Sequence, residues 1–433
     1  MADGAQFNRE TADLLGKTSD WVYGFLKTRP NLRRVAVSTH TAAIRGRIRV
    51  QQPFSSWRPS ELSISESTAE WHALTARDPS AFFRQVHEGE HVRNSPPKAT
   101  VQIRDPEYSE VLEVEIPPAF VAGIPGGHVV GEHGTVVTPE GNLLLDVSER
   151  TSALHVYVRG ERGRVPAPEA LAIEWKLSPR RLKGRAAVLS TFAGRGFYHW
   201  LFDVLPRIGL LRDAGIELEQ IEAFIVPVYA ARYQVETLAA LGIPRGKIIS
   251  SFRYRHLEVE QLLVPSLPRE KAIIPSWVCD FIRSSFPPSK PADFDPSDRI
   301  YIVRKQTDHG LLPNEREIAS QLNSLGFKSV AMEEFTLSEK AWILGRVNTI
   351  VSPGGAGLSN IVFANPGTRV IELQTRSFPQ MDTWDLANRM QLDHYFVLPE
   401  GRTGDADPER ATFGDSVRAD AVLETLELAG CLD

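Results

Sequence analysis

Hydrophobic residues recur along this chain in two periods, and from residue 186 onward the periods alternate. Short apolar runs such as Ala223-Phe-Ile-Val predict buried strands, whereas residues 198–214 and 233–241 carry apolar positions at helical spacing. A second series of the same kind begins at residue 299. Such alternation of strands and helices indicates a mostly parallel sheet with helices on its faces. We therefore expect an α/β fold.

The two series predict a full set of elements. Strands are expected at residues 187–190, 223–227, 247–249, 261–265, 299–304, 328–331, 348–352 and 368–373. Helices are expected at residues 198–214, 233–241, 315–325, 337–344 and 358–364. Upstream, residues 111–116 alternate with period two, residues 128–137 and 141–148 predict a hairpin closed by Thr138-Pro-Glu-Gly, and residues 154–158 predict another strand.

Breakers and composition predict the domain organisation. Residues 286–298 combine dense proline with polar residues and no periodicity, which is typical of a linker. We therefore expect an accessory segment at 1–95, a Rossmann-like domain at 96–285, the linker, a second Rossmann-like domain at 299–400, and a tail or helix at 401–433. Two doubly wound domains facing a cleft would bind ligands outside the carboxyl ends of their strands.

Composition narrows the class of protein. Of 433 residues, 42% are hydrophobic and 24% are charged, which excludes a disordered or collagen-like chain. The net charge of −5 gives no reason to expect a nucleic-acid partner. The basic run Arg45-Gly-Arg-Ile-Arg fits either a membrane-surface contact or a solvated face.

The cellular compartment is predicted from what the sequence lacks. It has two cysteines, Cys279 and Cys431, no apolar stretch of membrane-spanning length, and no secretory signal pattern. Asn94 is followed by Ser95 and Pro96, so it is not a glycosylation acceptor, and no other asparagine fits. We expect a cytoplasmic protein, peripheral to the inner face of the membrane if the basic run contacts lipid. The oligomeric state is open.

A glycine-rich turn is the first candidate site. The apolar strand at 348–352 runs through Pro353-Gly354-Gly355-Ala356-Gly357 into a predicted helix that begins with Leu358, Ser359 and Asn360. Glycines allow close approach of the backbone to a ligand, and a helix N-terminus offers free N–H donors, so the pattern suits a diphosphate. A tight strand-to-helix turn without a ligand is the alternative. The turn matches neither a Walker loop nor GxGxxG.

A polar stripe in an apolar helix is the second candidate. His199 and Asp203 are four residues apart and share a helix face, and Arg207 extends the stripe beyond Pro206. Polar groups beside a core are costly unless paired, so the stripe is either a structural network or a site. As a site, its carboxylate and imidazole could remove a proton from a hydroxyl nucleophile.

Weaker candidates lie nearby. Arg304 and Lys305 follow a predicted strand and fit either a phosphate clamp or an exposed strand end. Glu372, at the end of a strand after the glycine turn, could accept hydrogen bonds from ribose hydroxyls or lie at the core edge. Asn314 and Glu315 are expected to cap a helix.

No metal site is expected. Asp293-Phe-Asp295 resembles the Asp-x-Asp of metal-dependent sugar transferases but falls in the proline-rich linker. Four histidines show no ligand spacing with cysteine or carboxylate clusters, namely His128, His133, His155 and His256.

Two motifs together resemble glycosyltransferase family 61. The first is Tyr198-His-Trp-Leu-x-Asp-x-Leu-Pro-Arg207. The second is Gly355-Ala-Gly-Leu-Ser-Asn-x-x-Phe363 followed by Pro366-Gly-Thr-x-x-Ile-Glu-Leu373. The resemblance covers roughly residues 105–400.

The resemblance implies a GT-B architecture and an inverting, metal-independent transfer from a nucleotide sugar, expected to be UDP-linked, to a glycan or glycolipid in bacterial capsule or lipopolysaccharide synthesis. No cofactor is implied. Asp203 or His199 would act as the base from the acceptor-side domain, supported by Arg207. Residues Gly354, Gly355, Ala356, Gly357, Leu358, Ser359, Asn360 and Glu372 would bind the donor, with Arg304 and, in support, Lys305 and His309 near the phosphates.

The chain departs from the family pattern at two places. Gly354 stands where a histidine is common, and the stretch after Arg304 lacks a further arginine, which His309 would replace in part. These departures leave a second hypothesis open, a catalytically weakened nucleotide-sugar-binding scaffold or regulatory subunit of the same fold. An α/β oxidoreductase is disfavoured by the lack of GxGxxG.

Overall fold

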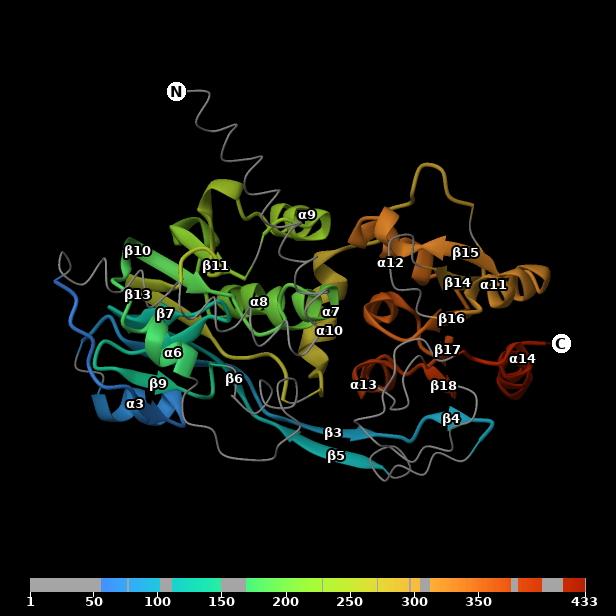
Figure 1. Ribbon diagram of the computed structural model, residues 1–433, viewed down its shortest axis with the longest axis horizontal. Coiled ribbons are helices and arrows are strands. Elements are labelled where there is room, and N and C mark those ends of the chain that lie inside the picture. Colours follow the sequence, from blue (N-terminus) through green and yellow to red (C-terminus); the bar gives the residue numbers. More distant parts are fainter. Residues whose placement is uncertain are drawn as a thin grey trace. The chain divides into compact units, whose positions relative to one another are not determined.

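The computed structural model describes residues 56–75, 78–101, 111–148, 169–227, 229–270, 272–295, 297–303, 312–374, 381–398 and 416–432. The chain divides into two compact units, each built around a β-sheet with helices (Figure 1). Unit 1 comprises Met1–His87 and Ala119–Leu267, and unit 2 comprises Glu88–Pro118 and Pro268–Asp433. The α/β class expected from the alternating pattern is confirmed in both.

Four parallel strands form the centre of unit 1. They are β10 (Arg180–Val188), β11 (Ala223–Val226), β12 (Ile248–Ser250) and β13 (His256–Pro265). In space their order is β12-β11-β10-β13, so the order along the chain reverses direction between β10 and β13. In a doubly wound sheet, such a reversal opens a crevice at the carboxyl ends of the two strands concerned.

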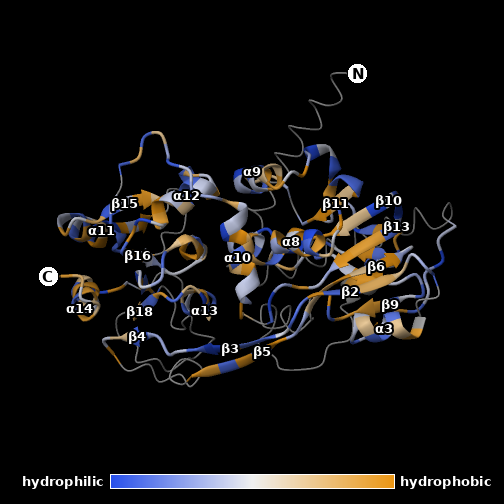
Figure 2. Ribbon diagram, turned by 180° about the vertical axis from the view of Figure 1, so that it is seen from behind, coloured by the Kyte–Doolittle hydropathy of each residue, from blue (hydrophilic) through white to orange (hydrophobic). Residues whose placement is uncertain are grey.

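Further strands, paired antiparallel except for β1 with β9, extend this sheet beyond β13. The added strands are β1 (Ser63–Ser65), β2 (Phe82–His87), β6 (Ala119–Pro125), β7 (His128–Val130), β8 (Thr135–Val137) and β9 (Asn142–Leu144). The predicted turn Thr138-Pro-Glu-Gly joins β8 to β9, which pair antiparallel. Strand β6 is almost wholly buried and is coloured hydrophobic in Figure 2, and it pairs with both β2 and β13.

Helical segments of unit 1 connect or cover these strands. They are α3 (Thr68–Thr75), α6 (Glu169–Glu174), α7 (Phe197–His199), the π-helix η2 (Trp200–Val204), α8 (Pro206–Asp213), α9 (Arg232–Ala240), and the 3₁₀ turns η3 (Leu218–Gln220) and η4 (Arg245–Lys247). The core packed on this sheet is mainly aliphatic, with Ala122, Ile124 and Ile225 fully buried. The apolar run Ala223-Phe-Ile-Val forms β11 because a central parallel strand is covered on both faces.

Unit 2 contains a six-stranded parallel sheet. Its strands, in spatial order, are β15 (Lys328–Ala331), β14 (Arg299–Val303), β16 (Thr349–Pro353), β17 (Arg369–Leu373), β18 (Asp393–Val397) and β4 (Lys98–Ala99). The order along the chain reverses direction between β14 and β16, which defines the switch point of this sheet. Figure 1 shows β4, in blue, beside β18, in red, although nearly 300 residues separate them.

Helices cover both faces of the sheet in unit 2. Those described are α10 (Ser276–Ser285), α11 (Glu315–Ser324), α12 (Leu337–Leu344), α13 (Met381–Arg389), α14 (Ala419–Leu428), and the 3₁₀ segments η5 (Met332–Glu334) and η6 (Ala356–Phe363). Helices α11 and α14 pack against one face through Tyr301, Ile371 and Tyr395. On the other face η6 contacts α12 and α13, so the chain after the glycine turn is held between the sheet and two helices.

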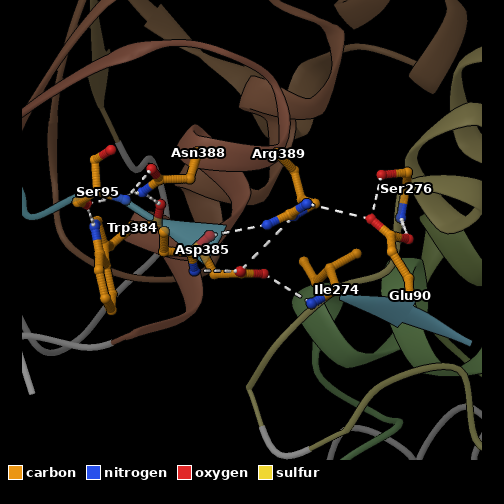
Figure 3. Close-up of polar contacts among 9 residues, drawn as sticks. Glu90, Ser95, Ile274, Ser276, Trp384, Asp385, Asn388 and Arg389 are labelled. Carbon is orange, nitrogen blue, oxygen red and sulfur yellow. Dashed lines mark hydrogen bonds and ion pairs between the residues drawn. The ribbon is translucent and has the colours of Figure 1, made fainter. Parts of the chain in front are cut away.

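Residues 88–118 belong to unit 2 through a buried polar network (Figure 3). Strands β3 (Glu90–Asn94) and β5 (Leu112–Ile116) pair antiparallel, and Asn94 donates to the buried carboxylate of Asp385 over 2.7 Å. The other oxygen of Asp385 accepts from the main-chain N–H of Ile274, and Arg389 donates to both Asn94 and Glu90. Burial raises the pKa of Asp385 to about 6, against the hydrogen bonds from Asn94 and Ile274 that lower it.

These boundaries differ from the predicted domain scheme. Residues 63–87 supply strands to the sheet of unit 1, so this part of the predicted accessory segment is integral to the fold. The boundary between units falls after Leu267, and the proline-rich stretch 286–298 lies within unit 2. That stretch connects α10 to β14. Loss of periodicity identifies a loop, but it does not show whether a domain ends at that loop.

Candidate functional site

His199 and Asp203 form a hydrogen-bonded pair in unit 1. Nδ1 of His199 lies 2.7 Å from Oδ2 of Asp203, and the side chains are 33% and 9% exposed, respectively. They lie one turn apart on α7 and η2, in the helical stretch that follows the carboxyl end of β10. The predicted sharing of one helix face therefore produces a direct contact, with the imidazole as the more accessible member.

The pair lies where the helix widens into a π turn. The N–H of Leu205 donates to the carbonyl of Trp200, five residues back, and the next residue is Pro206, which has no N–H to donate. The indole of Trp200 is fully buried and donates to Thr237 in α9. This anchoring and the proline fix the widened turn, and π turns occur frequently at functional sites.

The hydrogen bond also fixes the proton on the imidazole. An ionised carboxylate can only accept hydrogen bonds, so Nδ1 of His199 must be the donor. In the neutral ring, Nε2 then carries the lone pair. The geometry therefore prepares Nε2 of His199 to accept a proton, with Asp203 orienting the ring.

Arg207 lies at the switch point of unit 1. It is fully buried, and its guanidinium donates to the carbonyl of Ser190 over 2.9 Å and to that of Pro265 over 2.6 Å. Ser190 follows β10 and Pro265 ends β13, so Arg207 bridges the two strands between which the order reverses. Burial lowers the pKa of Arg207 to about 9, while the negative charge of Asp203 acts in the opposite direction.

The loop that leads into this helix is strained. Ala193 has a φ of +50°, in the left-handed region that costs a residue with a Cβ about 1–2 kcal/mol. The loop is nevertheless held on both sides, because Gly194 and Gly196 donate to the carbonyls of Thr191 and Ala193. Strain of this kind concentrates at functional sites, and here it lies in the loop that leads to His199.

The glycine turn lies at the switch point of unit 2. It follows the buried strand β16, and β14 is its neighbour across the reversal in strand order. Gly355 has a φ of +131°, a conformation that side chains disfavour, and a Cβ on Gly354 would lie 2.9 Å from Oε1 of Glu372. The two glycines are therefore required by the backbone path and by a close neighbour.

The helix after the turn is a 3₁₀ helix. The sequence predicts an α-helix at 358–364, whereas η6 spans Ala356–Phe363 with 3₁₀ geometry, which seldom persists for more than one turn. Ser359 and Asn360 are only 2% and 1% exposed. Asn360 donates to the carbonyl of Gly357, but Oγ of Ser359 and Oδ1 of Asn360 have no hydrogen-bond partner among the described residues.

Glu372 is buried against a histidine that sequence analysis did not select. Its Oε2 lies 3.0 Å from Nε2 of His394 in β18, and the two side chains are 1% and 3% exposed. Within the described part of the chain, Nδ1 of His394 and Nε2 of Gln374 are also buried without a partner. His394 and Gln374 lacked a signal because neither falls in a motif, and only the parallel register brings β17 and β18 together.

Several predicted site residues cannot be placed. Arg304, Lys305 and His309 fall in residues 304–311 and His155 in residues 149–168, all outside the described part of the chain. Asn314 does occupy the N-cap of α11, but its side chain donates to the carbonyl of Val417 instead of capping the helix. A cap would need the amide oxygen of Asn314 to accept from a helix N–H, and that oxygen has no hydrogen-bond partner among the described residues.

The remaining histidines and carboxylates are partnered in other ways. His128 and His256 lie 3.1 Å apart in the core of unit 1, and His256 also lies 2.6 Å from the carbonyl of Leu177. Burial lowers the pKa of both rings to about 4. Asp293 and Asp295 are exposed on either side of the buried Phe294. Among the described residues, no three histidine, cysteine, aspartate or glutamate side chains are grouped to hold a metal ion.

Comparison with known protein families gives one match. Residues 197–371 match the family model described as Glycosyltransferase 61. This match supports the resemblance inferred from the two motifs and, with it, a glycosyltransferase activity. It spans less than half of the chain, yet it includes the His199–Asp203 pair and the glycine turn, and Glu372 follows directly. A search of curated proteins found no match.

No helix in the described ranges is both long enough and apolar enough to span a membrane.

Proposed function

We propose that this protein is an inverting glycosyltransferase that moves a sugar from a nucleotide-sugar donor to a hydroxyl of a glycan or glycolipid. The observation that carries the proposal is the oriented His199–Asp203 pair, which follows the carboxyl end of the parallel strand β10 in unit 1. The sheet of unit 2 has a glycine turn at its own switch point. The family match over residues 197–371 supports the transfer of a sugar.

The proposed reaction is one displacement at the anomeric carbon. Nε2 of His199 accepts the proton of the acceptor hydroxyl while the hydroxyl oxygen forms the new glycosidic bond. The bond from the anomeric carbon to the diphosphate oxygen breaks, and the nucleoside diphosphate leaves with the electron pair. Attack opposite to the leaving group inverts the anomeric configuration. Asp203 stabilises the imidazolium that forms, because its carboxylate already accepts from Nδ1.

The leaving diphosphate is assigned to the glycine turn. The first N–H groups of η6 point to its N-terminal end, where a helix carries partial positive charge and lacks internal partners. The absence of a side chain at Gly355 is proposed to let phosphate oxygens approach the main chain. Ser359 and Asn360 add polar atoms without partners, and Arg304 and Lys305, which follow β14 in sequence, are proposed to supply positive charge. Neutralisation by these groups requires no metal ion.

We further propose a GT-B architecture, with unit 1 receiving the acceptor and unit 2 the donor. Strand orders that reverse once in each sheet support it. The donor is proposed to be UDP-linked, and the role to be surface-polysaccharide synthesis of the capsule or lipopolysaccharide type, in the cytoplasm or at the inner face of the membrane. The combined presence of both motifs of the resemblance supports this assignment.

The test uses the full-length chain and separates binding from turnover. UDP, GDP, CDP and dTDP are screened by thermal shift, and the corresponding nucleotide sugars are assayed for transfer to a panel of glycosides. At least one diphosphate is expected to raise the melting temperature, because a ligand that binds only the folded state stabilises it. Transfer is expected to fail in His199→Gln, and Asp213→Asn is the control because Asp213 lies half-exposed at the end of α8.

Each result has a separate meaning. Binding without transfer to any acceptor would favour the scaffold hypothesis over the enzyme. Transfer that survives His199→Gln would overturn the assigned base. Absence of binding by all four diphosphates would overturn the assignment of the glycine turn.

A further inference from the structure

Two polar side chains approach the glycine turn of unit 2 from the neighbouring strand. Glu372 lies near the end of β17, and Gln374 follows that strand, with its main-chain N–H still donating to the carbonyl of Val397 in β18. Positions two apart on a strand share a face of the sheet. A Cβ on Gly354 would lie 2.9 Å from Oε1 of Glu372 and 3.8 Å from Oε1 of Gln374, so both side chains reach the backbone of the turn.

Both side chains carry hydrogen-bonding atoms without a partner. They are only 1% and 2% exposed. Within the described ranges, the side-chain amide of Gln374 makes no hydrogen bond, and the carboxylate of Glu372 makes one, through Oε2. Buried polar groups without partners are costly. Their position at the carboxyl end of a strand, where ligands of doubly wound sheets bind, therefore points to a ligand.

His394 holds the other oxygen of this carboxylate. Its Nε2 lies 3.0 Å from Oε2 of Glu372 and must be the donor, because an ionised carboxylate can only accept. The buried ring packs edge-on against Phe396, with 4.8 Å between the ring centroids. Since Nδ1 has no partner in the described part of the chain, the hydrogen bond to Glu372 fixes the ring and the carboxylate together. This bond leaves Oε1 of Glu372 for a ligand.

A carboxylate oxygen beside a carboxamide suits a pair of adjacent hydroxyls. A hydroxyl donates to a carboxylate and accepts from an amide nitrogen, and the amide of Gln374 can turn either of its polar atoms to the ligand because no hydrogen bond holds it. A phosphate is disfavoured at this position, because its negative charge would lie against that of Glu372. In a nucleotide sugar, the ribose carries two adjacent hydroxyls close to the diphosphate.

We propose that Glu372 and Gln374 bind the two ribose hydroxyls of the donor nucleotide, and that His394 is the positioning residue that turns Oε1 of Glu372 toward them. The sequence alone suggests only Glu372 for this role. The register of β17 with β18 and the geometry at Gly354 add the other two residues. The inference rests on the proposed function, since it requires a nucleotide at the glycine turn. His394 acts through Glu372 and does not touch the ligand.

Four variants of the full-length chain test this arrangement. His394→Phe removes the donor and keeps a ring, His394→Gln keeps a donor, and Gln374→Met removes the amide at a similar volume. His91→Phe is the matched control, because His91 in β3 also pairs with a glutamate, Glu115, but both of these side chains are exposed. Circular dichroism and thermal melting establish which variants are folded.

The readout is the affinity for three probes, namely UDP, 2′,3′-dideoxy-UDP and inorganic pyrophosphate, measured by calorimetry. The wild type and His91→Phe should bind UDP more tightly than its dideoxy analogue. His394→Phe and Gln374→Met should each lower the affinity for UDP by about tenfold, as expected for the loss of one hydrogen bond in a binding site. They should leave the affinities for the other two probes unchanged, and His394→Gln should retain most of the affinity for UDP.

The three probes separate recognition of the ribose from damage to the fold. A distorted glycine turn would weaken all of them together, so an equal loss for all three in folded His394→Phe would overturn the role of His394. Equal affinity of the wild type for UDP and its dideoxy analogue would overturn the ribose assignment. Unchanged affinity for UDP in folded Gln374→Met would remove Gln374 from the site.

A measurement without any ligand decides the role of His394 should His394→Phe not fold. Long-range ¹⁵N–¹H correlation on histidine-labelled protein should show the Nε2–H tautomer for the signals that disappear in His394→Gln, and the Nδ1–H tautomer would overturn the positioning role. Binding of pyrophosphate without binding of UDP would overturn this inference alone. Binding of neither probe would overturn the proposed function as well.

Discussion

The two switch points of this protein are built in opposite ways. In unit 1 the ends of β10 and β13 are bridged by Arg207, and the hydrogen bonds there are made within the protein. In unit 2 the turn after β16 is half-buried at Gly354 and Gly355, and buried polar atoms nearby lack partners within the described part. The first arrangement fixes side chains, whereas the second leaves donors and acceptors for a ligand. The difference supports the proposal that the chemistry belongs to unit 1 and donor binding to unit 2.

The largest expected effect is a loss of turnover without a loss of affinity for the nucleoside diphosphate. His199→Ala should lower turnover by about 10²–10⁴-fold, the usual contribution of a general base. Affinity for the nucleoside diphosphate should be unchanged, because the glycine turn is untouched. Steady-state kinetics and calorimetry check the two effects separately. A proportional loss of both would contradict the division of labour between the units.

The next effect is on stability at the switch point of unit 1. Arg207→Met should lower the free energy of unfolding by about 2–4 kcal/mol, since it leaves the buried carbonyls of Ser190 and Pro265 without donors. Arg212→Met should change it by less than about 1 kcal/mol, as expected of an exposed side chain. Urea unfolding of both variants makes the comparison. Equal effects would show that the guanidinium of Arg207 does not secure the switch point.

A third expectation is that acidification affects the two units in opposite directions. His128 and His256 have pKa values lowered to about 4, so the unfolded chain binds their protons first, and unit 1 loses stability as the pH falls from about 6.5 to 4. Asp385 has a pKa raised to about 6, so the folded state binds its proton first, and unit 2 loses stability as the pH rises through 6. Each group can change the free energy of unfolding by up to about 3 kcal/mol over its pH range.

The carboxyl of Glu174 in unit 1 has an effect on stability opposite to that of the two histidines. Burial raises the pKa of Glu174 to about 7, so its protonation stabilises the folded state as the pH falls, but one carboxyl is outweighed by two imidazoles. Protection factors from hydrogen exchange, followed peptide by peptide between pH 4 and 7, would resolve the units. Glu174→Gln should make the stability of unit 1 depend more steeply on pH, and Asp385→Asn should make the stability of unit 2 depend less steeply on pH. Slopes of the same sign in both units would refute this expectation.

The smallest effect sharpens the interpretation of the glycine turn. Ser359→Ala removes a buried hydroxyl that has no partner among the described residues, so the unliganded protein should gain up to about 1 kcal/mol of stability. The same change should weaken binding of the diphosphate. Ser324→Ala is the control, because Ser324 ends α11 and its exposed hydroxyl donates to the carbonyl of Gln321. A variant that is less stable and binds as tightly would place Ser359 in the fold alone.

Sequence periodicity predicted the central strands well, because each buried parallel strand has a distinctive apolar run. The runs at 223–227, 299–304 and 348–352 correspond to β11, β14 and β16. No helix was predicted at α10, although its buried residues Val278, Cys279 and Ile282 stand at helical spacing, and the unit boundary at Leu267 was also not predicted. Membership of residues 88–118 in unit 2 depends on contacts such as Asn94 with Asp385, nearly 300 residues apart, which no local pattern records.

The candidate site shows the same limit. Spacing of four residues predicted that His199 and Asp203 meet, since helix geometry alone brings them together. It could not predict the π turn, which depends on packing of Trp200, or that Arg207 turns from the stripe to the carbonyls of Ser190 and Pro265. The sequence did not predict a role for His394, because its partner Glu372 lies on the neighbouring strand.

The interleaved path of the chain has a consequence for how the protein can be made. Because residues 88–118 are synthesised early and belong to unit 2, the ribosome releases Glu90 long before its partners Ser276 and Arg389 exist. In unit 1, β2 can pair with β6 only after residues 88–118, which lie between them in the sequence, have been synthesised. Neither unit is a contiguous stretch that can be excised by one cut, so a fragment starting at Pro268 would lack its edge strand β4 and the Glu90 anchor. Completion of unit 2 must therefore await translation of the last third of the message.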